Sequence, residues 1–147
     1  MTTFGDQLYQ YGGSPVGGLF TTGKVWFVKP DTGSDGHTGK RPDQAVATLA
    51  KAVTLATADK NDVIYLISES NTAANTTDYQ SATLTFSKDL VHVAGIGAPS
   101  PYSNRARIAQ LSTATGVTNL VTVSGDGGIY KNFSIFHGVA DATSLAA

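Results

Sequence analysis

The chain of 147 residues contains no cysteine, so disulfide bonds and thiolate metal sites are excluded. Charged residues are also scarce, at 14% of the sequence against roughly 25% in typical soluble domains. The lysines and arginines, 10 in all, form no cluster, and the formal net charge is -1. A protein that binds free nucleic acid usually has a basic face. We therefore expect no nucleic-acid partner, and stability that comes from packing alone.

Long apolar runs are missing as well. No run approaches the roughly 20 residues that a membrane helix needs. Met1 is followed by Thr2, Thr3, Phe4 and Gly5 instead of the basic and apolar regions of a signal peptide. We expect no membrane partner, and a product that is made in the cytoplasm and leaves it only inside a larger assembly.

Carboxylates are too few to favour an enzyme. A glycosidase needs two acidic side chains across the scissile bond, and Glu69 is the only glutamate. The pair would have to come from Asp62, Glu69, Asp78, Asp89, Asp126 and Asp141. Most of these residues lie beside glycine, asparagine or threonine, where a turn role is sufficient. We predict no catalytic residue, with a pair formed between neighbouring subunits as the alternative.

Candidate metal ligands are equally sparse. The acidic loop at residues 31–36 superficially resembles a calcium loop, but no glutamate closes it, so an Asx-turn is the favoured interpretation. His37, His92 and His137 are far apart in the sequence, and His92 alternates with valines, which is typical of a surface or stacking histidine. We predict no metal site and no cofactor.

Residues 24–58 read as a strand, a turn and a helix. Val25–Val28 form a β-branched and aromatic run that Pro30 ends, and residues 31–39 are turn material. Pro42 favours a first helical turn, and small apolar residues follow at helical spacing: Ala45, Leu49, Ala52, Val53 and Ala56. The pattern predicts a capping helix at about 43–58 with one apolar face.

Short apolar runs separated by glycine and proline turns fill the rest of the chain. They cover residues 63–67, 83–86, 90–94, 107–111, 120–123 and 133–136, whereas residues 68–82 are polar and turn-like. This predicts an all-β domain at 24–147. A helix directly after the first strand favours a parallel β-helix, whose open first rung needs a cover. The segments 90–97 and 132–138 are interpreted as equivalent positions in successive rungs.

Residues 1–23 differ from the rest and are predicted to be an extended anchoring arm. They combine many glycines with bulky side chains that follow no helical or strand period. Burying these side chains does not offset the cost of ordering the backbone, so the arm needs a surface to lie on. The predicted partner-binding residues are Phe4, Leu8, Tyr9, Tyr11, Pro15, Val16, Leu19 and Phe20.

The segment VWFVKPDTGSDGHTGKRPDQAVATLAKAV at residues 25–53 resembles the entry segment of right-handed parallel β-helix proteins of the pectate-lyase-like superfamily. The matching positions are Gly33, Ser34, Asp35, Gly39, Ala47, Thr48, Leu49 and Ala52. Lys29 and Val46 depart from the pattern, where an acidic residue and an aromatic are common. Together with FGDQLYQYGGSPVGG at residues 4–18, the chain is similar to virion-associated β-helix proteins of tailed bacteriophages.

This resemblance implies a short right-handed β-helix solenoid that forms a homotrimer and is part of the virion. It further implies a capsid decoration or head-fibre protein, anchored by its arm to the major capsid protein or another virion protein. The alternative is a tail spike or tail fibre that binds or cleaves a host-surface polysaccharide. Residues 137–147 offer no capping helix, so we expect a further domain or another subunit to cover that end.

Overall fold

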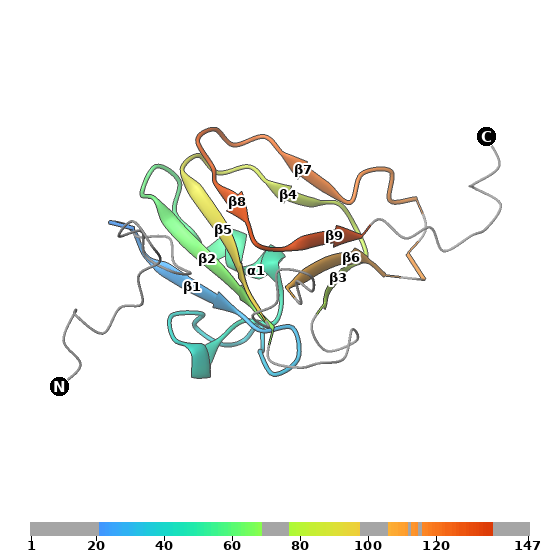
Figure 1. The fold of residues 1–147 in the computed structure, drawn as a ribbon, viewed down its shortest axis with the longest axis horizontal. Coiled ribbons are helices and arrows are strands. Elements are labelled where there is room, and N and C mark those ends of the chain that lie inside the picture. Colours follow the sequence, from blue (N-terminus) through green and yellow to red (C-terminus); the bar gives the residue numbers. More distant parts are fainter. Residues whose placement is uncertain (1–20, 69–76, 98–105, 112, 115, 137–147) are drawn as a thin grey trace, which may run out of the picture.

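The computed structural model describes residues 21–68, 77–97, 106–111, 113–114 and 116–136. These residues form mostly β-strands, with one α-helix and one 3-10 helix (Figure 1). The elements are β1 (Val25–Val28), η2 (Pro42–Gln44), α1 (Leu49–Leu55), β2 (Asp62–Ile67), β3 (Thr77–Gln80), β4 (Leu84–Phe86), β5 (Val91–Ile96), β6 (Arg107–Gln110), β7 (Val121–Val123), β8 (Tyr130–Lys131) and β9 (Ser134–Phe136). The prediction of an all-β fold with a single α-helix is confirmed for this part of the chain.

The strands form three parallel sheets and no closed barrel. The first sheet has the order β1-β2-β5-β8, the second β3-β6-β9, and the third β4-β7. From β2 onward the chain visits the first, second and third sheets in turn and then repeats that order (Figure 1). We call each visit a layer: β1, then β2 to β4, then β5 to β7, then β8 and β9.

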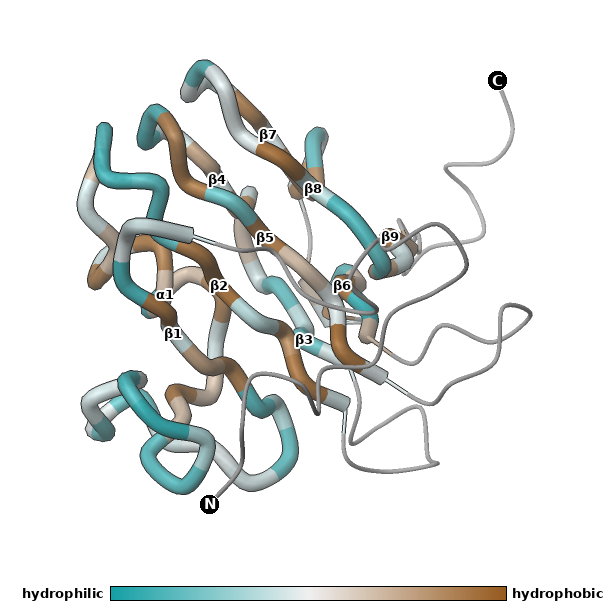
Figure 2. Tube along the Cα trace, turned by 60° about the vertical axis from the view of Figure 1, so that its left-hand side comes forward, coloured by the Kyte–Doolittle hydropathy of each residue, from teal (hydrophilic) through white to brown (hydrophobic). Residues whose placement is uncertain are grey.

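Parallel pairing places side chains of successive layers in columns. Trp26 pairs with Ile64, Ile64 with Val93, and Val93 with Tyr130, so one column runs through the first sheet. In the second sheet Asp78 pairs with Ile108. The tube of β1, β2 and β5 is mostly hydrophobic, with single more polar positions in between (Figure 2). Parallel sheets are normally covered on their faces, and these columns form a single core between them.

Strand β3 was not predicted, because its segment is polar. Thr77, Asp78 and Gln80 are nevertheless buried. Burying such groups is tolerated when they are hydrogen-bonded, and Asp78 Oδ2 accepts a bond of 2.9 Å from the backbone N–H of Leu49. Asp78 can therefore be buried because another element supplies a hydrogen-bond partner. The two-residue strand β8 was also missed.

The predicted helix at 43–58 is wrong in extent. Pro42–Gln44 form a 3-10 turn, Val46 pairs with Val28 as an isolated parallel bridge, and the α-helix begins only at Leu49. The side chain of Thr48 is its N-cap and accepts a bond of 3.1 Å from the backbone N–H of Lys51. The predicted apolar face is buried, but its first residues belong to an extended segment.

The segments 90–97 and 132–138 are not equivalent. Val93 and Ala94 pair with Tyr130 and Lys131, whereas Ser134–Phe136 pair with β6 in the second sheet. Only two residues separate β8 from β9, so the chain turns sharply at Asn132, whose φ is +60°. A Cβ at Gly95 would lie 2.7 Å from the carbonyl carbon of Asn132. Any side chain at position 95 would therefore collide with the backbone of this turn.

Candidate functional site

All eight predicted anchoring residues, from Phe4 to Phe20, lie outside the described residues. The structure does describe the place where that arm joins the sheets, at residues 21–24, which we call the arm root. It leads directly into β1, the first strand of the first sheet. The arm root is therefore the described part of the predicted anchoring site.

The arm root is tied to the turn before β2. Thr21 Oγ1 donates to the carbonyl oxygen of Asn61 and accepts a bond of 2.8 Å from the N–H of Gly23. The N–H of Lys24 donates to Asp62 Oδ1 at 2.8 Å. A Cβ at Gly23 would lie 2.6 Å from the carbonyl carbon of Asn61, so the two backbones approach too closely for any other residue. These contacts fix residues 21–24 against the turn before β2.

Asp62 holds this junction together. It is 1% exposed, and its Oδ2 accepts bonds from Trp26 Nε1 at 3.0 Å and from the N–H of Thr57 at 2.9 Å. Burial raises the pKa of Asp62, but the bonds from Trp26, Lys24 and Thr57 outweigh it and leave that pKa below its ordinary value. The ionised carboxylate thus joins β1, β2 and the segment after α1.

A pocket of about 340 Å³ opens beside the arm root. Its lining residues are Thr22, Gly23, Lys24, Thr57, Lys60 and Asp62. Both carboxylate oxygens of Asp62 already accept bonds from the protein. The remaining polar groups are two lysines and two threonines, which can donate hydrogen bonds to a chain segment lying there.

The outer edge of β1 is covered by residues 39–46, which we call the capping segment. The N–H of Phe27 donates to Gly39 O at 2.8 Å, and the carbonyl of Phe27 accepts from the N–H of Val46 at 3.0 Å. Helix α1 contacts β1, β2 and β4, and its buried residues belong to the core. We call this side of the domain, formed by β1, the capping segment and α1, the closed end.

Two aspartates bond to the N-terminus of α1, Asp35 from the loop after β1 and Asp78 from β3. Asp35 accepts bonds of 2.9 and 3.0 Å from the N–H groups of Ala47 and Thr48, and a third of 2.8 Å from Thr48 Oγ1. These partners are far along the chain, so the local Asx-turn expected at Asp35 is not what its side chain makes. Burial raises the pKa of Asp78 to about 6, and the bond from Leu49 opposes that shift.

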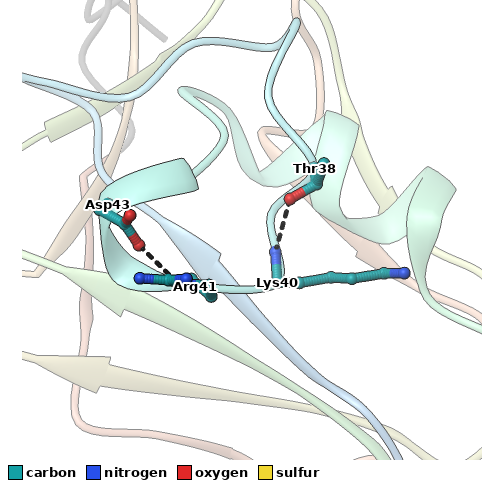
Figure 3. A network of polar contacts seen from close by, with 4 residues as sticks. All are labelled: Thr38, Lys40, Arg41 and Asp43. Carbon is teal, nitrogen blue, oxygen red and sulfur yellow. Dashed lines mark hydrogen bonds and ion pairs between the residues drawn. The ribbon is translucent and has the colours of Figure 1, made fainter.

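The capping segment is mostly hydrophilic in its first part (Figure 2), and residues 40–44 are exposed. Arg41 Nε and Asp43 Oδ1 form an ion pair at 3.0 Å, and the N–H of Lys40 is 3.5 Å from Thr38 Oγ1 (Figure 3). Both members of the ion pair are largely exposed. Exposed ion pairs contribute little to stability. This pair therefore faces water and does little to stabilise the capping segment.

The predicted carboxylates and histidines do not form a catalytic or metal centre in the described part of the chain. Asp62 and Asp78 are buried and bonded to backbone N–H groups, and Asp89 accepts from the N–H of Asp126 at 2.8 Å. Glu69, Asp141 and His137 lie outside the described residues. No group of three or more histidines, aspartates or glutamates is arranged to hold a metal ion among the residues that the structure describes.

His92 instead links neighbouring layers. Its Nδ1 accepts a bond of 3.1 Å from the N–H of Ile129, so the ring proton lies on Nε2, which is 3.5 Å from Asn61 Oδ1. His37 Nδ1 lies 3.1 Å from the carbonyl oxygen of Ala45. Both rings therefore have structural partners, and His92 is buried, not on the surface.

Within the described residues, no helix is long and apolar enough to cross a membrane. Comparisons of the chain with protein-family models, with curated proteins and with solved structures found no match. The function is therefore inferred from the residues and their arrangement alone.

Proposed function

We propose that this chain is a structural virion protein of a tailed phage. In this proposal it is a capsid decoration or head-fibre protein, and residues 1–23 bind the major capsid protein or another virion protein. The observation that carries the proposal is the arm root. A glycine- and aromatic-rich arm needs a surface to be ordered, and this arm leaves from a fixed point at the closed end.

The body of the protein is, in the same proposal, a short right-handed parallel β-helix that assembles as a homotrimer. The visiting order of the three parallel sheets supports a coil, because each layer repeats the order of the layer before it. The backbone cover on β1 also supports it, since a coil of this kind must protect its first edge. The capping segment and α1 then act as the cover of the first rung.

The alternative is a tail spike or tail fibre that binds or cleaves host polysaccharide. Cleavage of a polysaccharide is less well supported than a structural function. Asp62 and Asp78 are the buried carboxylates among the described residues, and backbone N–H groups occupy both. A catalytic acid or base must instead be within reach of the substrate.

The anchor is tested by comparing the full chain with a chain that begins at Thr21. Both are mixed with capsids that lack this protein, and the bound fraction is measured by co-sedimentation. We expect the shortened chain to lose at least about a hundredfold in affinity, since aromatic anchors dominate interface energies. Its unfolding midpoint should stay close to that of the full chain, because the arm root is retained. Binding that survives the deletion refutes the anchor.

The choice between the two functions is tested by incubating the full chain with host capsular or O-antigen polysaccharide. We expect no new reducing ends. Release of sugar by the purified protein contradicts a purely structural function.

A further inference from the structure

The pocket beside the arm root has polar groups that the fold itself does not use. Its volume is about 340 Å³, and three parts of the chain line it: the arm root, the segment after α1 and the first residue of β2. This volume is near the lower limit of small-molecule sites, so it suits one side chain or one small ion better than a polymer. The pocket is therefore a candidate binding site for a single polar or charged group.

The charge of the lining favours an anion. Lys24, Lys60 and Asp62 are its charged residues, and together they leave one net positive charge. Asp62 is a poor ligand for a cation, because its two oxygens already accept bonds from the N–H groups of Lys24 and Thr57 and from Trp26 Nε1. The two ammonium groups therefore decide which ligand the pocket attracts.

Both lysines are available to a ligand. They are exposed, and neither forms an ion pair with another described residue. Lys88 shows the contrast, because its Nζ donates to the carbonyl oxygens of Thr54 and Ala56 at the end of α1. The fold thus uses Lys88, whereas the ammonium groups of Lys24 and Lys60 have no hydrogen bond of this kind within the described part of the chain.

The rest of the lining adds hydrogen-bond donors. Thr22 and Thr57 contribute hydroxyl groups. Ammonium and hydroxyl groups donate to the oxygens of a carboxylate or a phosphate, and bonds to an ionised acceptor are the stronger ones. The bonds from the N–H groups of Lys24 and Thr57 to Asp62 hold the backbone of two lining residues in place. The fold therefore positions the site before a ligand arrives.

We propose that this pocket receives a carboxylate side chain of the virion protein to which the chain docks. The partner follows from the proposed function, on which this inference rests, and its chemistry follows from charge complementarity. An aspartate or glutamate side chain ends in the group that two lysines and two hydroxyls can bind. Phosphate offers similar oxygens, so it is the competing ligand in the test. An interfacial ion pair of this kind contributes mainly to specificity and to the rate of association.

The site is tested first without any virion component. Amide signals of the full chain are followed by NMR during titration with acetate, and separately with inorganic phosphate, at constant ionic strength. We expect saturable shifts at Gly23, Lys24 and Thr57 with acetate, with a Kd of about 10 mM. The double variant Lys24→Gln, Lys60→Gln should raise that Kd at least about tenfold, whereas Lys131→Gln, on β8, should leave it unchanged. Absence of saturable shifts, equal shifts in the double variant, or shifts with phosphate alone overturn the proposal.

The partner is tested by co-sedimentation with capsids that lack this protein. We expect the double variant to bind about tenfold more weakly than the unchanged chain, with a difference that shrinks as salt is raised. Lys131→Gln should bind as the unchanged chain does, and equal unfolding midpoints show that the variants are folded. Equal capsid binding by the double variant overturns the docking of a carboxylate. If the unchanged chain does not bind capsids, the proposed function and the partner are overturned, and the acetate titration decides separately whether the pocket is an anion site.

Discussion

The two ends of this domain contain similar residues but differ in how those residues are covered. At the closed end, Trp26 and Val28 are buried, because the capping segment bonds to the edge of β1 and α1 lies over the core. The last strands of the three sheets, β7, β8 and β9, form the opposite end, which we call the open end, and there Val123 and Ile135 are about half exposed. The contrast teaches that burial in a stack of parallel strands depends on the neighbouring layer more than on the residue itself.

The ends also differ in how their backbone is satisfied. The edge of β1 exchanges hydrogen bonds with Gly39 and Val46, whereas β7 pairs only with β4 among the described strands. Free edges attract other strands. The backbone at the edge of the closed end is thus satisfied by the capping segment, and the outer edge of β7 is not paired within the described residues.

The largest expected effect comes from one pair of isoleucines in the same column. Ile108→Ala should lower the free energy of unfolding by about 2–5 kcal/mol, because it leaves a cavity in a packed layer. Ile135→Ala should cost less than about 1 kcal/mol, because half of that side chain is already in water. Urea unfolding of the two variants measures the difference. Equal losses would show that the open end is covered over β9.

The next effect is a dependence on pH that originates at Asp78, where β3 meets the N-terminus of α1. The folded-state pKa of Asp78 is raised to about 6, so the folded protein holds this proton more tightly than the unfolded chain. Stability from this group is therefore present below the unfolded value near 3.8 and decreases as pH rises toward 6. We expect a decrease of up to about 3 kcal/mol across that window. Urea unfolding between pH 4 and pH 7 measures it.

Asp78→Asn is the control for this pH effect. The amide oxygen of asparagine can still accept from Leu49, but the side chain no longer titrates. The decrease in stability between pH 4 and 6 should be smaller in this variant. Asp62 does not contribute to this decrease. Its pKa is lowered in the folded protein, so the stability that it provides is lost only as the pH falls below about 4. An unchanged pH dependence in the variant would assign the effect to another group.

A smaller effect is expected where the arm root joins the closed end. Asp62→Asn replaces one carboxylate oxygen by a donor that must face another N–H group, so at least one charge-assisted bond is lost. The expected cost is about 1.5–3 kcal/mol. Asp59→Asn is the matched control, because Asp59 is exposed and its φ of +60° suits asparagine. Similar unfolding midpoints for the two variants would contradict the role given to Asp62.

The smallest effect is expected on the outer surface of the capping region. Arg41→Gln removes the exposed ion pair with Asp43 (Figure 3) and should change the free energy of unfolding by less than about 0.5 kcal/mol. A large loss in thermal unfolding would mean that this surface is buried against a partner or another subunit.

Much of the fold could be predicted from local pattern, because β-branched and aromatic runs bounded by glycine or proline mark strands. Strand β3 could not, since its buried residues are polar, and the N–H of Leu49 that bonds to Asp78 is 29 residues away. The start of α1 was misplaced because Pro42 begins a 3-10 turn instead of the α-helix. The N-cap at Thr48 was the local signal for the correct start.

The site was less predictable than the fold. The arm was predicted from its composition, and residues 1–20 lie outside the described part of the chain. The residues that hold residues 21–24 in place were not predicted. Asp62 directly precedes the apolar run at residues 63–67. A carboxylate in that position was the local signal that its side chain has a buried partner. Its partner Trp26 Nε1 lies 36 residues earlier in the chain, and no local pattern connects the two.

The central claim is that the closed end of the domain faces the virion. Cross-linking of capsid-bound full chain with a short amine-reactive reagent, followed by mass spectrometry, tests this orientation most directly. Lys24 and Lys40 are exposed at the closed end, whereas Lys131 lies on β8 at the open end. We predict that cross-links to capsid protein form at Lys24 and Lys40 and not at Lys131. Cross-links concentrated at Lys131 would contradict the account.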